Sequence, residues 1–176
     1  MEKQPGEIKP QEQDINLEGD TWEIPSNYQI ISLVTDKFEE RIRASGWSEE
    51  DGFLREGFQE ALTNAIVHGN LGVGKDIGGA VRSDVLKKAQ EESSARPERF
   101  VHVAMKEISP SRIEVVITDE GEGFDPDAVA DPRKPENIEK SAGRGILIMR
   151  AGFDTVDFEN GGRTVRLIKE KKGSGQ

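Results

Sequence analysis

The stretch EGFQEALTNAIVHGNLG, residues 56–72, carries a carboxylate, an amide and an imidazole at intervals of four residues. Glu60, Asn64 and His68 therefore fall nearly above one another on a helix of 3.6 residues per turn. A neighbouring stripe of apolar residues repeats at helical spacing and should face a core: Leu54, Phe58, Ala61, Leu62 and Ala65. The polar residues are expected at the edge of a buried face, where oxygen ligands suit Mg²⁺ and phosphate chemistry.

This polar stripe also has a simpler interpretation. Glu60 and Asn64 could be a solvated helix face, with His68 near the helix end and Gly69 or Gly72 as the stop. The stretch alone does not separate the two interpretations, so the choice depends on two later segments.

Composition limits the classes of protein to which the chain can belong. Its 176 residues suit one domain, with 34% hydrophobic and 33% charged residues. The formal net charge of −10 provides no general field for nucleic acid or an anionic membrane, so neither is expected as a partner. A phosphate ligand would need a local device such as backbone N–H groups, a helix N-terminus or a metal.

The absence of cysteine excludes disulfides, thiolate metal sites and cysteine nucleophiles. No apolar signal core and no long apolar window is visible, so a cytoplasmic protein is expected. We expect a disordered tail at residues 1–18, one domain at residues 19–170, and a second tail at residues 171–176.

The first half of the chain predicts a strand and two helices. Residues 21–24 can form the strand, and Ser26 can cap a helix that ends near Ala44. Ser48 resembles a second cap, from which the central helix runs to about His68. Residues 73–99 form a predicted insertion that includes a short helix capped by Ser83.

The second half predicts strands, a loop and a helix. Alternating apolar residues or turn-bounded apolar runs indicate strands at residues 100–106, 113–118, 155–158 and 164–168. A long surface loop at residues 125–142 precedes a short apolar helix at residues 146–151. This order favours an α+β fold, a two-layer α/β sandwich with helices on one face of a mixed, mostly antiparallel sheet.

Two glycine-bearing motifs later in the chain add to the evidence from the central helix. DEGEGF, residues 119–124, places a carboxylate at a strand end before two glycines, and GRG, residues 143–145, precedes the short apolar helix. Asp119 could by itself merely cap a turn, and Gly145 could be ordinary helix-entry punctuation. All three segments in this order, at these places relative to helices and strands, are much harder to obtain by chance.

The sequence resembles the ATP-binding fold of the GHKL superfamily, the Bergerat-type fold shared by DNA gyrase, heat-shock chaperones, histidine kinases and mismatch-repair ATPases. EALTNAIVHG is similar to its N box, DEGEGF to its first glycine box and GRGI to its second. The compact chain and EALTNAIVHGN most resemble the bacterial anti-sigma-factor serine-protein kinases. The similarity runs from about residue 21 to residue 169.

The resemblance implies roles for five residues. Asn64 would hold Mg²⁺ through its amide oxygen, and Glu60 would be the general base that orients a hydroxyl or a water towards the γ-phosphate. Asp119 would accept a hydrogen bond from the adenine amino group. Gly121 and Gly123 would let the backbone pass close to the nucleotide.

The resemblance also implies an ATP lid at about residues 131–142. The amides of Gly143, Arg144 and Gly145 would cradle phosphates, with Arg144 either adding charge or pointing to solvent. Thr164 occupies the position of the threonine that supports the adenine contact. ATP and Mg²⁺ are the implied cofactors.

Two functions follow from the resemblance. The first is a Mg·ATP-dependent serine/threonine kinase that phosphorylates an anti-sigma-factor antagonist and binds a sigma factor. Glu60 supports it, because transfer to a hydroxyl profits from a placed carboxylate. The alternative is a nucleotide-gated switch with little or no phosphotransfer, in which the lid changes an interface. The resemblance implies a homodimer. A histidine kinase is disfavoured, because neither His68 nor His102 lies on a dimerising phosphoacceptor helix.

Overall fold

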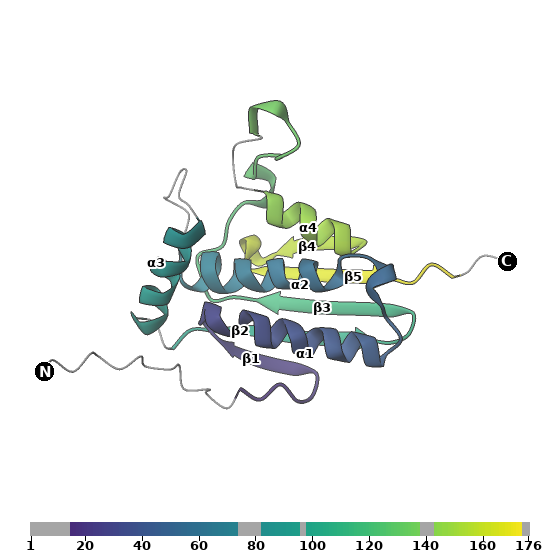
Figure 1. The fold of residues 1–176 in the computed structure, drawn as a ribbon. Helices are drawn as coiled ribbons and strands as arrows, with labels where there is room; N and C mark the ends of the chain where they lie inside the picture. Colours follow the sequence, from purple (N-terminus) through teal and green to yellow (C-terminus); the bar gives the residue numbers. More distant parts are fainter. Residues whose placement is uncertain (1–14, 74–81, 96–97, 138–142, 174–176) are drawn as a thin grey trace, which may run out of the picture.

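The computed structural model describes residues 15–73, 82–95, 98–137 and 143–173. Its five strands form one sheet in the order β1-β2-β3-β5-β4, and every neighbouring pair is antiparallel (Figure 1). The strands are β1 (Thr21–Pro25), β2 (Phe100–Ile108), β3 (Arg112–Thr118), β4 (Thr155–Glu159) and β5 (Thr164–Glu170).

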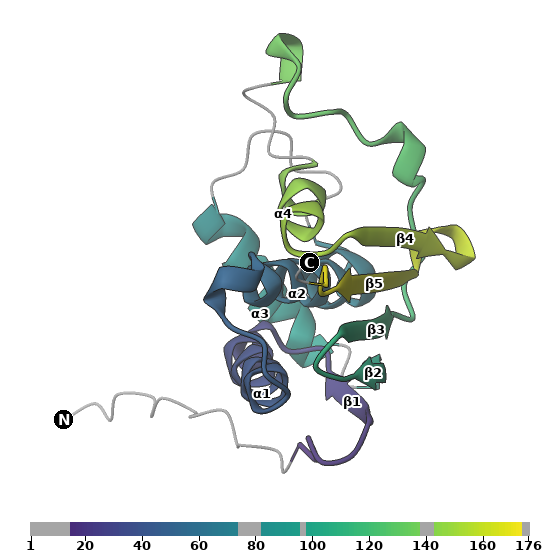
Figure 2. The ribbon, with the colours of Figure 1, turned by 90° about the vertical axis from the view of Figure 1, so that its right-hand side faces the viewer.

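The described α-helices lie on one side of this sheet, as an edge-on view shows (Figure 2). They are α1 (Ile31–Ala44), α2 (Leu54–Thr63), α3 (Arg82–Ala95) and α4 (Arg144–Gly152). Helix α2 packs against both α1 and α4. The predicted α+β sandwich in two layers is therefore confirmed.

The strands follow the alternation of their side chains. In β3, Ile113, Val115 and Ile117 are buried against the helices, while the residues between them are half-buried on the other face. Val103 of β2 pairs with Ile117, so apolar side chains meet across the two strands on the helix side. A one-residue slip of this register would expose the whole apolar set.

Helix packing in the core centres on two aromatic rings. Phe38 of α1 and Phe58 of α2 stack with their ring centroids 4.0 Å apart and their planes 8° from parallel. Both side chains have an exposed fraction of 0%. The stack fixes how α2 lies on the domain, and α2 carries Glu60.

The start of α1 differs from the prediction. Ser26 does not cap it: its hydroxyl donates to the carbonyl of Arg99 at 2.7 Å. Asn27 instead caps a short 3₁₀ turn, η1 (Tyr28–Ile30), by accepting a hydrogen bond from Gln29 N, and α1 continues from that turn. Local sequence placed the cap one residue early because Ser26 is used in a contact that is distant in sequence.

The start of the central helix also differs. Ser48 and Asp51 form the expected capping box, but it closes a separate 3₁₀ turn, η2 (Glu49–Asp51). Gly52, with φ of 111°, interrupts the helical conformation after this turn, and α2 begins at Leu54.

The predicted insertion at residues 73–99 contains α3, which begins at Arg82, one residue before the predicted cap Ser83. Residues 74–81 and 96–97 of this segment lie outside the described residues. Ala89 of α3 has an exposed fraction of 0% and belongs to the core. Near the N-terminus, Leu17 is also buried in the core, although the sequence analysis assigned it to the N-terminal tail.

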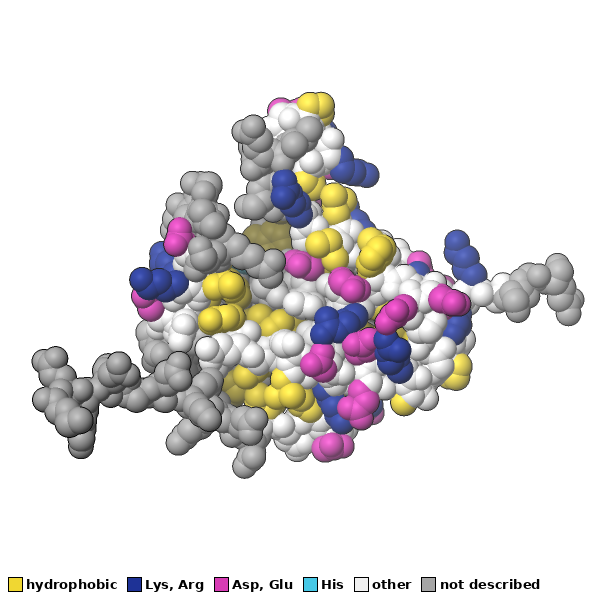
Figure 3. Space-filling view, in the orientation of Figure 1, with side chains coloured by type: hydrophobic (Ala, Val, Ile, Leu, Met, Phe, Trp, Pro, Cys, Tyr) yellow, Lys and Arg dark blue, Asp and Glu magenta, His cyan; other side chains and the backbone are white. Residues whose placement is uncertain are grey.

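The helix-bearing face carries acidic and basic side chains beside one another (Figure 3). Arg55 of α2 pairs with Asp36 at 2.5 Å and with Glu39 at 2.8 Å, which ties α2 to α1. Arg43 pairs with Glu39 and Glu49. Within the described residues, no helix has both the length and the apolar character needed to cross a bilayer.

Candidate functional site

The predicted central helix continues beyond α2 as a π-helical turn, η3 (Asn64–Asn70). The amide of Leu71 donates to the carbonyl of Ile66, five residues earlier, at 3.0 Å. Such turns are rare and often occur at functional sites. Glu60 lies in the last turn of α2 and Asn64 begins η3, and both side chains are half-buried.

The structure brings Glu60 and Asn64 to the first turn of α4. A Cβ at Gly145 would lie 2.9 Å from Glu60 Oε2, 3.6 Å from Asn64 Nδ2 and 3.8 Å from Asn64 Oδ1. A side chain at position 145 would have to displace the Glu60 carboxylate, so glycine leaves the helix start close to these polar groups. Residues separated by about 80 positions in sequence therefore share one small volume beside the N-terminal amides of a helix, which attract anions.

Asp119 lies directly after β3 and its carboxylate faces the end of η3. A Cβ at Gly69 would come within 2.5 Å of Asp119 Cγ, and a Cβ at Gly121 within 2.3 Å of the Gly69 carbonyl oxygen. Gly121 N donates to Asp119 Oδ1 at 2.8 Å, so this carboxylate does close a local turn as well. The exposed fraction of Asp119 is 9%.

Gly123 lets the same loop contact the hairpin between β4 and β5. Its φ is 78°, and a Cβ there would lie 2.1 Å from the carbonyl oxygen of Gly161. The amide of Phe124 donates to that same oxygen at 2.9 Å, and the Phe124 ring meets Phe158 edge to face at 5.2 Å. In this structure the glycines of the first box allow close approach of backbone to backbone.

The structure places Thr164 at the start of β5, opposite Thr118, the residue that precedes Asp119. Thr164 pairs with Thr118 across β3 and β5, and their hydroxyl oxygens are 3.1 Å apart. Asn160 Nδ2 also donates to Thr164 Oγ1 at 3.1 Å.

Part of the predicted lid, residues 138–142, lies outside the described residues. The described part, 131–137, projects beyond α4 (Figures 1 and 2). Arg133 holds the pKa of the Asp131 carboxyl at about 2, chiefly through a side-chain hydrogen bond. Gly143, in the left-handed region with φ of 85°, caps α4 and would place a Cβ 2.6 Å from the carbonyl oxygen of Ala130. The two ends of the lid segment therefore meet.

The remaining predicted residues have simpler positions. Arg144 is exposed at the start of α4. His68 Nδ1 lies 2.6 Å from the carbonyl oxygen of Val73, a contact that holds the chain after η3. The sequence offered Gly69 only as a possible helix stop and gave Asn70 no role, yet both residues touch the loop after β3. Their position directly after the polar trio was the available signal.

A single bound metal would have few protein ligands here. Among the described residues, no group of three or more histidine, aspartate or glutamate side chains is arranged to hold a metal ion. Asn64 offers an amide oxygen and Glu60 a carboxylate beside Gly145 at the start of α4. This donor set fits Mg²⁺, which usually takes one or two protein ligands together with phosphate oxygens and water.

A family comparison agrees with this geometry. Residues 24–169 match the model of the histidine kinase-like ATPase domain. The chain belongs to this family. Comparison with curated proteins gives no match. As a histidine kinase-like ATPase domain of the GHKL type, the chain binds ATP and has an ATPase or kinase-type fold.

The match spans nearly all of the sandwich of this histidine kinase-like ATPase domain. It begins at Ile24 in β1 and ends at Lys169 in β5, so it includes all three motifs. The family thus accounts for the convergence of α2, the loop after β3 and the start of α4.

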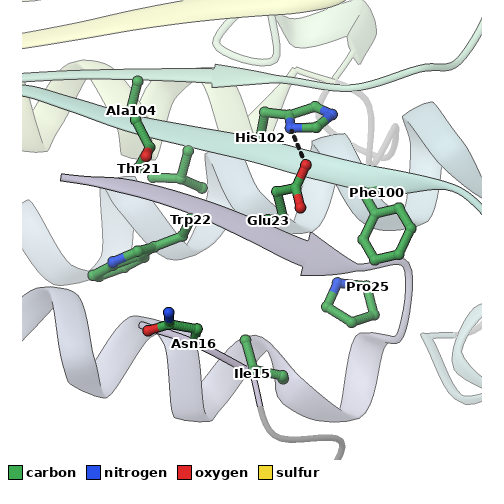
Figure 4. Close-up of a pocket in the computed structure, with 10 residues that line it drawn as sticks. Ile15, Asn16, Thr21, Trp22, Glu23, Pro25, Phe100, His102 and Ala104 are labelled. Carbon is green, nitrogen blue, oxygen red and sulfur yellow. Dashed lines mark ion pairs between the residues drawn. The ribbon is translucent and has the colours of Figure 1, made fainter. Parts of the chain in front are cut away.

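A cavity of about 630 Å³ lies elsewhere in this domain, along β1 and β2 (Figure 4). Its lining includes Trp22, Phe100 and His102, and His102 Nδ1 lies 3.7 Å from Glu23 Oε1. None of the residues predicted to bind the nucleotide lines this cavity. The cavity is separate from the candidate site.

Proposed function

We propose that this domain is a Mg·ATP-dependent serine/threonine protein kinase that phosphorylates an anti-sigma-factor antagonist and binds a sigma factor, as a cytoplasmic homodimer. The observation that best supports phosphotransfer is the approach of Glu60 and Asn64 to Gly145. It places a proton acceptor and an oxygen ligand beside the amides of a helix start. An ATP-binding domain needs this combination if it is to act on the γ-phosphate.

Each group has a distinct task in the proposed reaction. The γ-phosphate would lie at the first turn of α4, at Gly143, Arg144 and Gly145. Glu60 would accept the proton of a serine or threonine hydroxyl while that hydroxyl oxygen forms a bond to the γ-phosphorus. The bond from that phosphorus to the bridging oxygen breaks, and ADP leaves. Asn64 would hold Mg²⁺, which neutralises phosphate charge when bound.

Recognition of the base is assigned to the loop after β3. Asp119, held by Gly69 and Gly121, would accept a hydrogen bond from the adenine amino group. Gly123 would keep the loop against the β4–β5 hairpin. The role of Thr164 stays a prediction, since its hydroxyl contacts Thr118 and Asn160.

The alternative function is a nucleotide-gated switch with little or no phosphotransfer. It is supported by the meeting of the lid ends at Gly143, because Gly143 directly precedes the proposed phosphate cradle. Phosphate contacts at that point could reposition residues 131–137 and alter a partner surface. Glu60 favours the kinase over this alternative, because a switch does not need a proton acceptor.

Calorimetric titration with ATP, ADP and GTP, with and without Mg²⁺, tests the nucleotide site. We expect adenine-selective binding that tightens with Mg²⁺. Incubation with γ-labelled ATP and anti-sigma-factor antagonists then separates the two functions. Label on a serine or threonine supports the kinase, whereas Mg²⁺-dependent ATP binding without transfer to any antagonist supports the switch. No nucleotide binding contradicts both.

A further inference from the structure

Asn70 ends the π-helical turn and its side chain is completely buried, with an exposed fraction of 0%. Its Nδ2 donates to Ser26 Oγ and to the Phe100 carbonyl oxygen, each at 2.8 Å. Its Oδ1 accepts from the amide of Glu120 at 2.6 Å. One carboxamide thereby joins three segments: the end of β1, the start of β2 and the loop after β3.

The hydrogen bond to Glu120 acts at the centre of the candidate base site. The amide of Glu120 belongs to the peptide that links it to Asp119. Asn70 directly follows Gly69, whose Cα lies against the Asp119 carboxylate. Two adjacent residues of η3 therefore hold Asp119, one by contact with its side chain and the other by a hydrogen bond to the next amide.

The surrounding contacts make this arrangement rigid. The Glu120 carboxylate accepts from the amide of Phe100 at 2.9 Å, so Asn70 and Glu120 hold both backbone groups of Phe100. Arg99 Nη1 donates to the Asn70 carbonyl oxygen at 2.7 Å, and Ser26 Oγ donates to the Arg99 carbonyl oxygen. Loss of the Asn70 side chain would remove hydrogen bonds from the part-buried Glu120 amide and Phe100 carbonyl, which is costly.

We propose that Asn70 is a positioning residue that fixes the Asp119 loop relative to the helix of Glu60 and Asn64, and thereby sets selectivity for the nucleotide base. The proposal rests on the proposed nucleotide site and deepens it. Because the Asn70 side chain is completely buried, it would act through the Asp119 loop and not by touching the nucleotide. It sets the distance between the group that reads the base and the groups that act on the phosphates, which lie on different elements.

The variants Asn70→Ala and Ser26→Ala separate this role from a general contribution to folding. Ser26→Ala removes an Asn70 partner but keeps the hydrogen bond to Glu120. We expect Asn70→Ala to weaken ATP binding about tenfold and to reduce the ratio of ATP to GTP affinity. Ser26→Ala should lower the melting temperature while leaving that ratio unchanged. Binding of inorganic tripolyphosphate with Mg²⁺ should change little in either variant.

The outcomes distinguish this inference from the proposed function. If the unaltered chain binds no ATP, the nucleotide site and this inference fail together. If it binds ATP and a folded Asn70→Ala protein keeps the same ATP to GTP ratio, only the inference fails.

Amide hydrogen exchange of the unaltered chain gives a second test that does not depend on a folded variant. A slowly exchanging Glu120 amide in the nucleotide-free protein supports the hydrogen bond to Asn70. Exchange as fast as that of an exposed loop amide overturns it.

Discussion

Gly69 lies against Asp119 so closely that a Cβ at position 69 would come within 2.5 Å of the carboxylate carbon and 2.7 Å of both its oxygens. Backbone from the end of the central helix therefore forms one wall around the group assigned to base recognition. The contact couples the helix of Glu60 and Asn64 to the loop after β3.

Gly69→Ala should displace the Asp119 loop. We expect ATP affinity to fall about tenfold or more, and the free energy of unfolding to drop by about 1–3 kcal/mol, because a methyl group is forced into occupied space. Isothermal titration and urea unfolding measure the two effects. Gly173→Ala is the matched control, since nothing lies within 4 Å of a Cβ there. Wild-type ATP affinity in Gly69→Ala would contradict the wall assigned to this glycine.

Glu60→Gln keeps the shape of the side chain and removes its ability to accept a proton. We expect ATP binding to stay within about threefold of wild type while phosphotransfer falls by about 10²–10⁴, the usual contribution of a general base. Single-turnover transfer of labelled phosphate measures this. Glu56→Gln, one helical turn earlier on the exposed face, should transfer normally. If Glu60→Gln loses binding and transfer together, Glu60 has a structural role.

Asp119→Asn tests the base contact with little change of shape, because an asparagine oxygen can still accept from Gly121 N. We expect ATP affinity to fall about tenfold to a hundredfold, as hydrogen bonds to charged groups contribute about 1.5–3 kcal/mol. GTP affinity should change less, so the preference for adenine should shrink. The control is Asp125→Asn, an exposed residue that caps a short turn. The adenine assignment does not survive if Asp119→Asn binds ATP as tightly as wild type.

The ion pairs between α1 and α2 predict a pH effect on stability. A hydrogen bond from Arg43, assisted by Arg55, lowers the pKa of Glu39 below its ordinary value of 4.5. A lowered carboxyl pKa contributes stability that is fully present above about pH 4.5 and is lost as the pH falls through the lowered value. Urea unfolding of wild type and Glu39→Gln should therefore differ at pH 7, by under about 1 kcal/mol, and converge at low pH. An equal difference at pH 7 and pH 3 would speak against this pair.

Phe58→Ala removes one of the two stacked rings, Phe38 and Phe58, through which α2 packs on α1. We expect the free energy of unfolding to fall by about 3–5 kcal/mol, because both rings are fully buried. Phe58→Leu should cost less, since it leaves a smaller cavity. Chemical denaturation followed by far-UV circular dichroism measures both. Phe53→Ala serves as the comparison, because that side chain is 60% exposed and should tolerate the change.

The sequence by itself determined the two layers and the three motifs. Apolar spacing in residues 56–72 placed Glu60 and Asn64 on one helix face, and alternation placed β2 and β3. These patterns are local, because the buried face of a helix or a strand appears in the sequence as apolar residues spaced with a period of 3.6 or 2. The family match over residues 24–169 agrees with that reading.

Tertiary structure alone decided which groups meet. Ser26 is of a residue type that often caps helices, yet its hydroxyl forms hydrogen bonds with Arg99 and Asn70, which are far away in sequence. The closeness of Gly145 to Glu60, and of Gly69 to Asp119, depends on how helices pack on the sheet. No local pattern encodes such a distance, because a glycine needed for close approach looks in sequence like one that ends a helix. Packing of the whole domain gives these residues their place in the site.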